Sequence, residues 1–205
     1  VEAEEAGADG VLLVSPYYNK ATQNGLKAHF TKIANSIKIP AILYNVPSRT
    51  GCSLAASTVA YLAKNAEYVT AIKEASGDIS HVADIMHACD GAIDLYSGND
   101  DQIVPILSLG GKGVISVLSN VAPKETHDIV ALFLEGKIKE SRELQLKALP
   151  LVHALFSEVN PIPVKAALNL MGKEVGPLRL PLTEMEAAHQ EVLVEEMKKF
   201  GIKLA

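Results

Sequence analysis

The sequence has few cysteines and no long apolar run, and both absences narrow the class of protein. Its two cysteines, Cys52 and Cys89, form no Cys-x-x-Cys pair and no dense framework, which is typical of a reducing compartment. Apolar runs such as residues 11–14 and 130–134 fall far short of the roughly 20 residues that a membrane-spanning helix needs. We therefore expect a cytoplasmic protein that does not use a membrane as a partner.

The sequence also lacks an excess of positive charge and a metal-binding pattern of histidines. It has 19 Lys and Arg against 24 Asp and Glu, and the lysines are dispersed among acidic residues, so we expect no nucleic-acid partner. None of the six histidines has another histidine four residues away, which disfavours a catalytic zinc site. The expected partner is a small molecule, and no metal cofactor is predicted.

An initiator methionine and a signal peptide are missing from the start of the chain. Residues 1–10 instead have the pattern of the last turns of a helix that Gly7 closes. We expect that the chain begins in the middle of a domain.

The sequence does contain a regular alternation of strand-like and helix-like segments. Strand-like runs begin near residues 10, 41, 69, 93 and 113, and a helical pattern follows each. This α/β alternation predicts parallel units, arranged either as an open doubly wound sheet or as part of a (β/α)8 TIM barrel. In the barrel alternative these are strands 4 to 8, with three units missing before Val1. The barrel part would cover residues 1–135, and a helical C-terminal domain would cover 136–205, with its last helix over 183–200.

Ligands of both architectures bind beyond the carboxyl ends of the parallel strands. Lys73 is the most informative residue there, because it interrupts an apolar strand whose interior face would be Val69, Ala71 and Lys73. Burial disfavours the charged form of lysine and lowers its pKa from about 10.4, which yields a neutral amine able to attack a ketone and form an imine. The alternative is a lysine in a structural ion pair, or one whose amine reaches solvent beyond the strand end.

Other strand-end residues have both a chemical and a structural interpretation. Tyr44 could move protons near Lys73, or pack with its hydroxyl bonded. Tyr17 and Tyr18 could extend that relay, or form aromatic packing at a surface. Arg49 follows Tyr44 and could hold a substrate carboxylate, or be a solvated loop residue.

Several ordered motifs resemble the pyruvate-dependent lyase family that includes dihydrodipicolinate synthase and N-acetylneuraminate lyase. The resemblance runs from Gly7 to the C-terminus. It rests on the segments 7–20, 44–51 (Tyr-Asn-Val-Pro-Ser-Arg-Thr-Gly), 72–77 (Ile-Lys-Glu-Ala-Ser-Gly), 97–100, 110–116 and 160–165.

The resemblance implies a (β/α)8 barrel with a helical C-terminal domain, assembled as a homotetramer of tight dimers. It implies that Lys73 forms the Schiff base with pyruvate, that Tyr44 donates and accepts protons, and that Tyr18 reaches into the neighbouring subunit. No cofactor is implied beyond the covalent pyruvate imine. The residues expected to bind substrate are Arg49, Ile115 through its backbone, Gly98 and Asn45.

Arg49 favours one activity within the family. It resembles the arginine that binds the carboxylate of L-aspartate 4-semialdehyde, the second substrate in the diaminopimelate route to lysine, whereas sialic-acid lyases usually lack it. Tyr17 resembles a residue near the site where lysine inhibits some members. The family's Gly-Thr-Thr-Gly-Glu segment, which binds the pyruvate carboxylate, is absent from the sequence, so the chain alone is expected to be inactive. Two alternatives stay open: a lyase for sialic acid or a keto-deoxy sugar acid, and a non-catalytic truncated protein.

Overall fold

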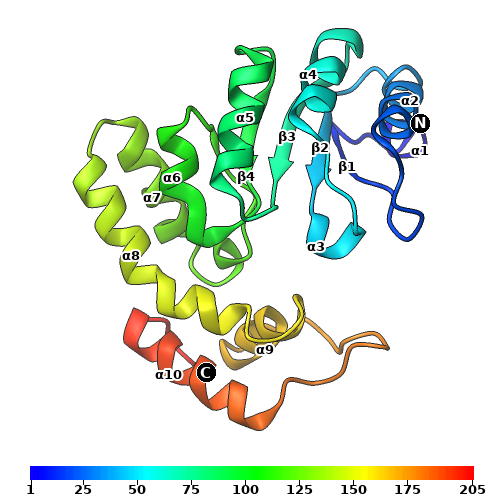
Figure 1. The fold of residues 1–205 in the computed structure, drawn as a ribbon. Helices are drawn as coiled ribbons and strands as arrows, with labels where there is room; N and C mark the ends of the chain where they lie inside the picture. Colours follow the sequence, from blue (N-terminus) through cyan, green and yellow to red (C-terminus); the bar gives the residue numbers. More distant parts are fainter. The chain divides into compact units, whose positions relative to one another are not determined.

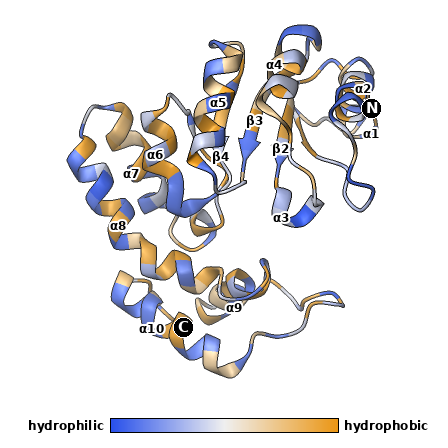
Figure 2. Ribbon diagram, viewed as in Figure 1, coloured by the Kyte–Doolittle hydropathy of each residue, from blue (hydrophilic) through white to orange (hydrophobic).

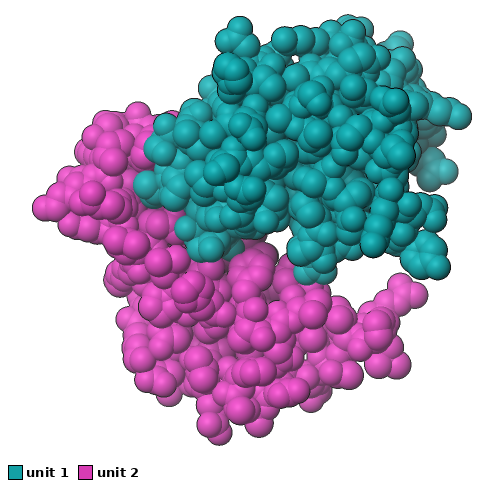
Figure 3. Space-filling view, viewed as in Figure 1, with its two compact units in different colours: residues 1–115 teal, residues 116–205 magenta.

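The computed structural model describes residues 1–205, which fold into two compact units. The first unit is Val1–Ile115 and the second is Ser116–Ala205, coloured teal and magenta in Figure 3. The sequence prediction assigned residues 116–135 to the barrel part, and in the structure they fall in the second compact unit.

The first unit is a parallel sheet of five strands in the order β1-β2-β3-β4-β5 (Figure 1). The predicted α/β class is therefore confirmed, and the strand order follows the chain without the reversal that defines a doubly wound sheet. The strands are β1 (Val11–Val14), β2 (Ala41–Asn45), β3 (Val69–Glu74), β4 (Asp94–Ser97) and β5 (Gly113–Val114). The helices are α1 (Glu2–Glu5), α2 (Gln23–Ala34), α3 (Pro47–Thr50), α4 (Ala56–Asn65), α5 (Ile79–Cys89), η1 (Asp100–Gln102) and α6 (Ile103–Ser108).

One face of this sheet packs against the helices and carries the core of the unit. Along β2, Ala41 and Leu43 are fully buried in that core, while Ile42 and Tyr44 point to the other face and are only partly buried. On the same other face of β1, Leu12 and Val14 are 46% and 42% exposed. Figure 2 shows hydrophilic residues at the end of β3.

The prediction that Val69 shares a face with Lys73 is wrong. Ala41 pairs with Val69 but Ile42 pairs with Ala71, so the register shifts and Thr70 is the extra residue. Such a bulge breaks the alternation of faces. Val69 consequently packs in the core on the helix-covered face, and only Ala71 and Lys73 share the other face.

The second unit is helical. It consists of η2 (Leu118–Asn120), α7 (Pro123–Leu134), α8 (Ile138–Leu155), α9 (Ile162–Leu170) and α10 (Ala187–Phe200), with its own buried apolar core. The last helix begins at Ala187 rather than at the predicted residue 183. Leu182 and Met185 pack against this core from the irregular chain before α10, and the carboxylate of Glu158 accepts a hydrogen bond from the Glu186 N–H at 3.0 Å. None of the helices is both long enough and apolar enough to cross a membrane.

Candidate active site

The carboxyl ends of β2, β3 and β4 bring three polar residues into one row. Tyr44 pairs in register with Lys73, and Lys73 pairs with Tyr96. Residues in register on neighbouring parallel strands point to the same face of the sheet. The Lys73 Nζ atom lies 4.4 Å from the centre of the Tyr44 ring, so the structure brings together the amine and the phenol that the sequence singled out.

Lys73 is half-buried, and its environment favours the neutral amine. Burial lowers the pKa of Lys73 from its ordinary value because the charged form loses hydration; Asp100 opposes this shift, and the Arg49 guanidinium adds to it. Asp100 is itself buried, at the start of η1 just after β4. The nucleophilic form of the amine is therefore present at lower pH than in a solvated lysine.

This environment predicts a distinctive titration. The rate at which Lys73 is acetylated by trace acetic anhydride should reach half its maximum below the ordinary lysine value of about 10.4, as read by peptide mass across a pH series. Asp100→Asn should lower that midpoint further, because it removes the anion that stabilises the charged form. Arg49→Ala should raise it, because it removes a repelling cation. A midpoint at or above the ordinary value, or shifts of opposite sign in the two variants, would contradict this electrostatic description.

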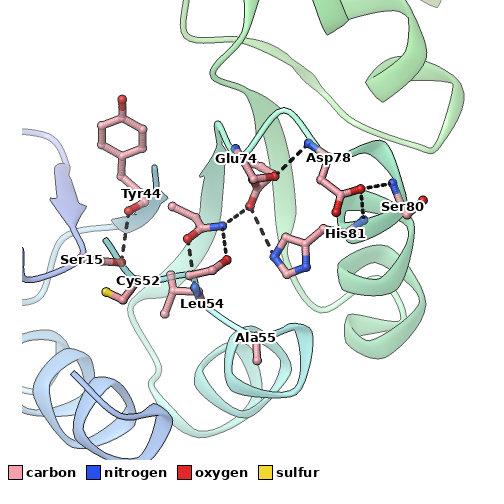
Figure 4. A network of polar contacts seen from close by, with 12 residues as sticks. Ser15, Tyr44, Cys52, Leu54, Ala55, Glu74, Asp78, Ser80 and His81 are labelled. Atoms are coloured by element: carbon pink, nitrogen blue, oxygen red, sulfur yellow. Dashed lines mark hydrogen bonds and ion pairs between the residues drawn. The ribbon is translucent and has the colours of Figure 1, made fainter. Parts of the chain in front are cut away.

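Tyr44 is also half-buried, and its phenol is kept protonated. Burial raises the pKa of Tyr44, and the nearby Arg49 guanidinium partly opposes that shift. A protonated phenol can donate a proton through its oxygen and accept one there. Figure 4 shows the Tyr44 ring pointing away from the polar network around Glu74. The next residue of β2, Asn45, belongs to that network, and successive residues of a strand point to opposite faces of the sheet.

Two further predicted residues shape the surroundings of Lys73. Gly98 follows β4, and a Cβ atom there would lie 2.6 Å from the Ala75 Cβ and 3.0 Å from the Lys73 Cε. The missing side chain at Gly98 thus leaves room for the Lys73 stem. Arg49 lies in α3, directly after β2, and its side chain is exposed while its charge acts on both Tyr44 and Lys73.

The structure does not bring Asn45 to this row. Asn45 is fully buried and its side chain is used within the fold: Nδ2 donates to the Glu74 carboxylate at 2.8 Å, and Oδ1 accepts from the Leu54 N–H at 3.0 Å. It lies one residue beyond Tyr44 and hence points to the other face of β2. The predicted contact between Asn45 and substrate therefore has no support in the geometry.

The remaining predicted residues lie at the margins. Tyr17 and Tyr18, in the loop after β1, are 70% and 89% exposed. Tyr18 has a φ of 70°, a conformation that is rare for a bulky residue. Ile115 is half-buried, and its N–H donates to the Ser97 carbonyl at 2.8 Å, which extends the pairing of β4 with β5.

Sequence reasoning did not single out Tyr96 or assign Asp100 a role at the site. The alternation of side chains along a strand could have identified Tyr96. Tyr96 is the second-to-last residue of β4, as Tyr44 is of β2, so both are expected to point to the same face of the sheet. The chain contains no group of three or more His, Cys, Asp or Glu side chains that could hold a metal ion.

Known proteins resemble the chain over almost its whole length. A sequence model described as the dihydrodipicolinate synthetase family matches residues 1–200. The 4-hydroxy-tetrahydrodipicolinate synthase of Lachnoclostridium phytofermentans is 64% identical over 98% of the chain and 68% of that protein.

Solved structures agree with this comparison. The enzyme from Cyanidioschyzon merolae with lysine bound has a TM-score of 0.95 at 42% identity, over 98% of the chain and 68% of that protein. The chloride-inhibited enzyme from Acinetobacter baumannii in complex with pyruvate has a TM-score of 0.94 at 40% identity, over 98% and 69%. Agreement of the family model, the sequence relative and the folds means that the chain belongs to the dihydrodipicolinate synthetase family.

Proposed function

We propose that Lys73 is the residue that attaches covalently to pyruvate in the condensation of pyruvate with L-aspartate 4-semialdehyde. The function of the chain is that of a 4-hydroxy-tetrahydrodipicolinate synthase, a lyase of the diaminopimelate route to lysine. The observation that carries the residue assignment is the half-buried Lys73 amine facing the Tyr44 ring at a strand end. No metal or organic cofactor is needed in this scheme, because the imine on Lys73 is the electron sink.

The reaction begins at the neutral amine of Lys73, which adds to the keto carbon of pyruvate. Water leaves as the imine forms, and the Tyr44 hydroxyl passes protons between the nitrogen and the leaving oxygen. Loss of a methyl proton gives the enamine, whose carbon attacks the aldehyde carbon of the semialdehyde. The amine of the semialdehyde then attacks the imine carbon, which frees Lys73 and closes the ring to give 4-hydroxytetrahydrodipicolinate. Holding enamine and aldehyde together can lower the barrier by roughly 7 to 11 kcal/mol.

The direct test is chemical trapping in the complete enzyme. Incubation with pyruvate and borohydride should reduce the imine and leave one pyruvate-derived adduct, located by peptide mass on the segment that contains Lys73. Consumption of the semialdehyde should accompany that of pyruvate in the unreduced enzyme. An adduct on another lysine, or no adduct, would overturn the assignment.

Arg49 is the proposed anchor for the carboxylate of the semialdehyde. Arg49→Ala should raise the KM for the semialdehyde by about 10- to 100-fold, the effect of losing one charge-assisted hydrogen bond. The adduct with saturating pyruvate should still form, and the exposed Arg142→Ala in α8 is the matched control. Unchanged KM in Arg49→Ala would favour the competing proposal of a lyase for sialic acid or a keto-deoxy sugar acid.

We also propose the wider context of the site. The five strands would be strands 4 to 8 of a (β/α)8 barrel, and the face that carries Leu12, Ile42 and Lys73 would point into it. The enzyme would assemble as a homotetramer of tight dimers, with Tyr18 reaching a neighbouring subunit and Tyr17 near an inhibitory lysine site. The exposure of both tyrosines on this single chain supports that proposal. Ile115 would hold pyruvate through its backbone.

A further inference from the structure

A buried polar network lies on the side of the sheet opposite to Lys73. It joins the side chains of Asn45 and Glu74 to the backbone N–H groups of Leu54 and Ser76 (Figure 4), and we call these four residues the Glu74 network. Glu74 is 1% exposed and Asn45 is fully buried. A carboxylate in such a place is costly to bury, and the reaction scheme above gives it no task.

The hydrogen bonds of this network fix the orientation of both side chains. The Leu54 N–H can only donate, so the Asn45 oxygen must face it, and the Asn45 NH2 group must face Glu74. The two Glu74 oxygens accept from Asn45 Nδ2 at 2.8 Å and from the Ser76 N–H at 2.6 Å. Glu74 therefore has to offer two acceptors, which a carboxylate supplies and an amide does not.

These bonds lie where two strands end. Asn45 and Glu74 are the last residues of β2 and β3 and pair with each other in register, next to the pair Tyr44 and Lys73. The backbone continues the pairing beyond them, since the Ala75 N–H donates to the Asn45 carbonyl and the Gly98 N–H to the Glu74 carbonyl. The side-chain bond between Asn45 and Glu74 thus adds a contact at the end of the pairing of β2 with β3. That pairing sets the distance between the Lys73 amine and the Tyr44 phenol.

The same network holds the loop that carries Arg49. Asn45 is the residue before that loop and Leu54 is where the loop returns to the core, fully buried. The Asn45 side chain also donates to the Ser53 hydroxyl at 3.2 Å. One buried amide therefore joins both ends of residues 46–53 to the end of β3.

His81 on α5 lies close to the Glu74 carboxylate. Its Nε2 atom lies 3.9 Å from Glu74 Oε2 and has no hydrogen-bond partner. At that distance it makes no hydrogen bond to Glu74. The orientation of Glu74 is hence set by Asn45 and Ser76.

We propose that Glu74 is a positioning residue, which acts through Asn45 to fix the ends of β2 and β3 and so holds Lys73, Tyr44 and Arg49 in their relative places. This inference rests on the proposed function, in which those three residues do the chemistry. Glu74 itself does not touch the reacting atoms, because it lies on the opposite face of the sheet.

Two variants of the complete enzyme test the pattern of donors and acceptors. In Glu74→Gln the new amide group must point its NH2 at either Asn45 Nδ2 or the Ser76 N–H, and both are donors. In the double variant Asn45→Asp with Glu74→Gln the pattern is restored. The carboxylate at residue 45 accepts from the Leu54 N–H and from the new amide, whose oxygen accepts from the Ser76 N–H.

The measurement is the rate constant of borohydride trapping with saturating pyruvate, beside the thermal midpoint of unfolding. We expect Glu74→Gln to slow trapping about 10- to 100-fold, since small misplacements of reacting groups have effects of that size. The double variant should return to within about threefold of the wild type, as expected for directly coupled residues. Leu62→Ala, which removes a buried core side chain of α4, should lower the thermal midpoint without slowing trapping in the folded enzyme.

The pH profile separates positioning from charge. Removing a nearby negative charge would lower the pKa of Lys73 and speed trapping at neutral pH, so slower trapping in Glu74→Gln from about pH 6 to about pH 10 supports positioning. If Glu74→Gln fails to fold, Asn45→Ser, which leaves the bond to Ser76, carries the same expectation of slower trapping.

Three outcomes would overturn the proposal. Wild-type trapping rates in both Glu74→Gln and Asn45→Ser would show that the network is not needed. A folded double variant no faster than the single one would show that the donor pattern is not the cause. No adduct in the wild type would overturn the proposed function as well, whereas the first two results leave that function standing.

Discussion

Lys73→Met is expected to abolish the pyruvate adduct and to lower kcat for the condensation by at least about 10³-fold. A positioned amine reacts as if it were present at an effective concentration far above that of any free amine. Methionine keeps an unbranched stem in the space that Gly98 leaves open and removes only the nucleophile. The measurement is borohydride trapping followed by intact mass, beside steady-state rates.

Lys112→Met is the matched control, because Lys112 precedes β5 with an exposed side chain that pairs with Asp94. It should keep both the adduct and the rate. Lys73→Met should also be no less stable than the wild type, because a half-buried amine is replaced by an apolar group. A pyruvate adduct that persists in Lys73→Met would refute the assignment of the nucleophile.

Tyr44→Phe is expected to lower kcat by about 10²- to 10⁴-fold, the range that general acid–base groups contribute. The ring stays, so the contact of the Lys73 amine with its face is retained, and the loss is that of the hydroxyl alone. Pyruvate binding should change much less than kcat, and the adduct should still form slowly.

The chain offers a close control for this substitution. Tyr61 in α4 also has a lysine over its ring, with Lys27 Nζ 5.0 Å from the ring centre, but it lies outside the site and is 42% exposed. Tyr61→Phe should leave kcat unchanged. Equal kcat values for Tyr44→Phe and the wild type would remove Tyr44 from the proton transfers.

Elements of the fold could be predicted where the hydrophobic periodicity of a short segment is enough to identify them. The five strands follow from such patterns and are confirmed. The start of α10 was not predictable in this way. Extended chain and helix can both bury Leu182 and Met185, and the contact of Glu158 with the Glu186 N–H comes from a distant part of the sequence.

The site was predictable only in part, for a related reason. Lys73 stands out because a charge in an apolar strand is conspicuous, and Tyr44 because it holds the same place in the preceding strand. Asn45 is, like Tyr44, a polar residue at the end of β2, yet its side chain points to the core. Which of two neighbouring residues faces the ligand depends on strand parity, and parity is lost where the backbone carries an irregularity.

The irregularity in β3, the extra residue Thr70, has a chemical consequence. If β3 had no bulge and Thr70 paired with Ile42, continuous alternation from the pair Ala41 and Val69 would turn Lys73 toward the helices and put Glu74 on the face that carries Tyr44. The bulge therefore selects which member of an adjacent acid–base pair meets the ligand. The Lys73 amine then lies on one side of the sheet, and the Glu74 carboxylate that holds the strand ends lies on the other. A backbone irregularity three residues upstream thus decides whether this strand presents a nucleophile or an anion.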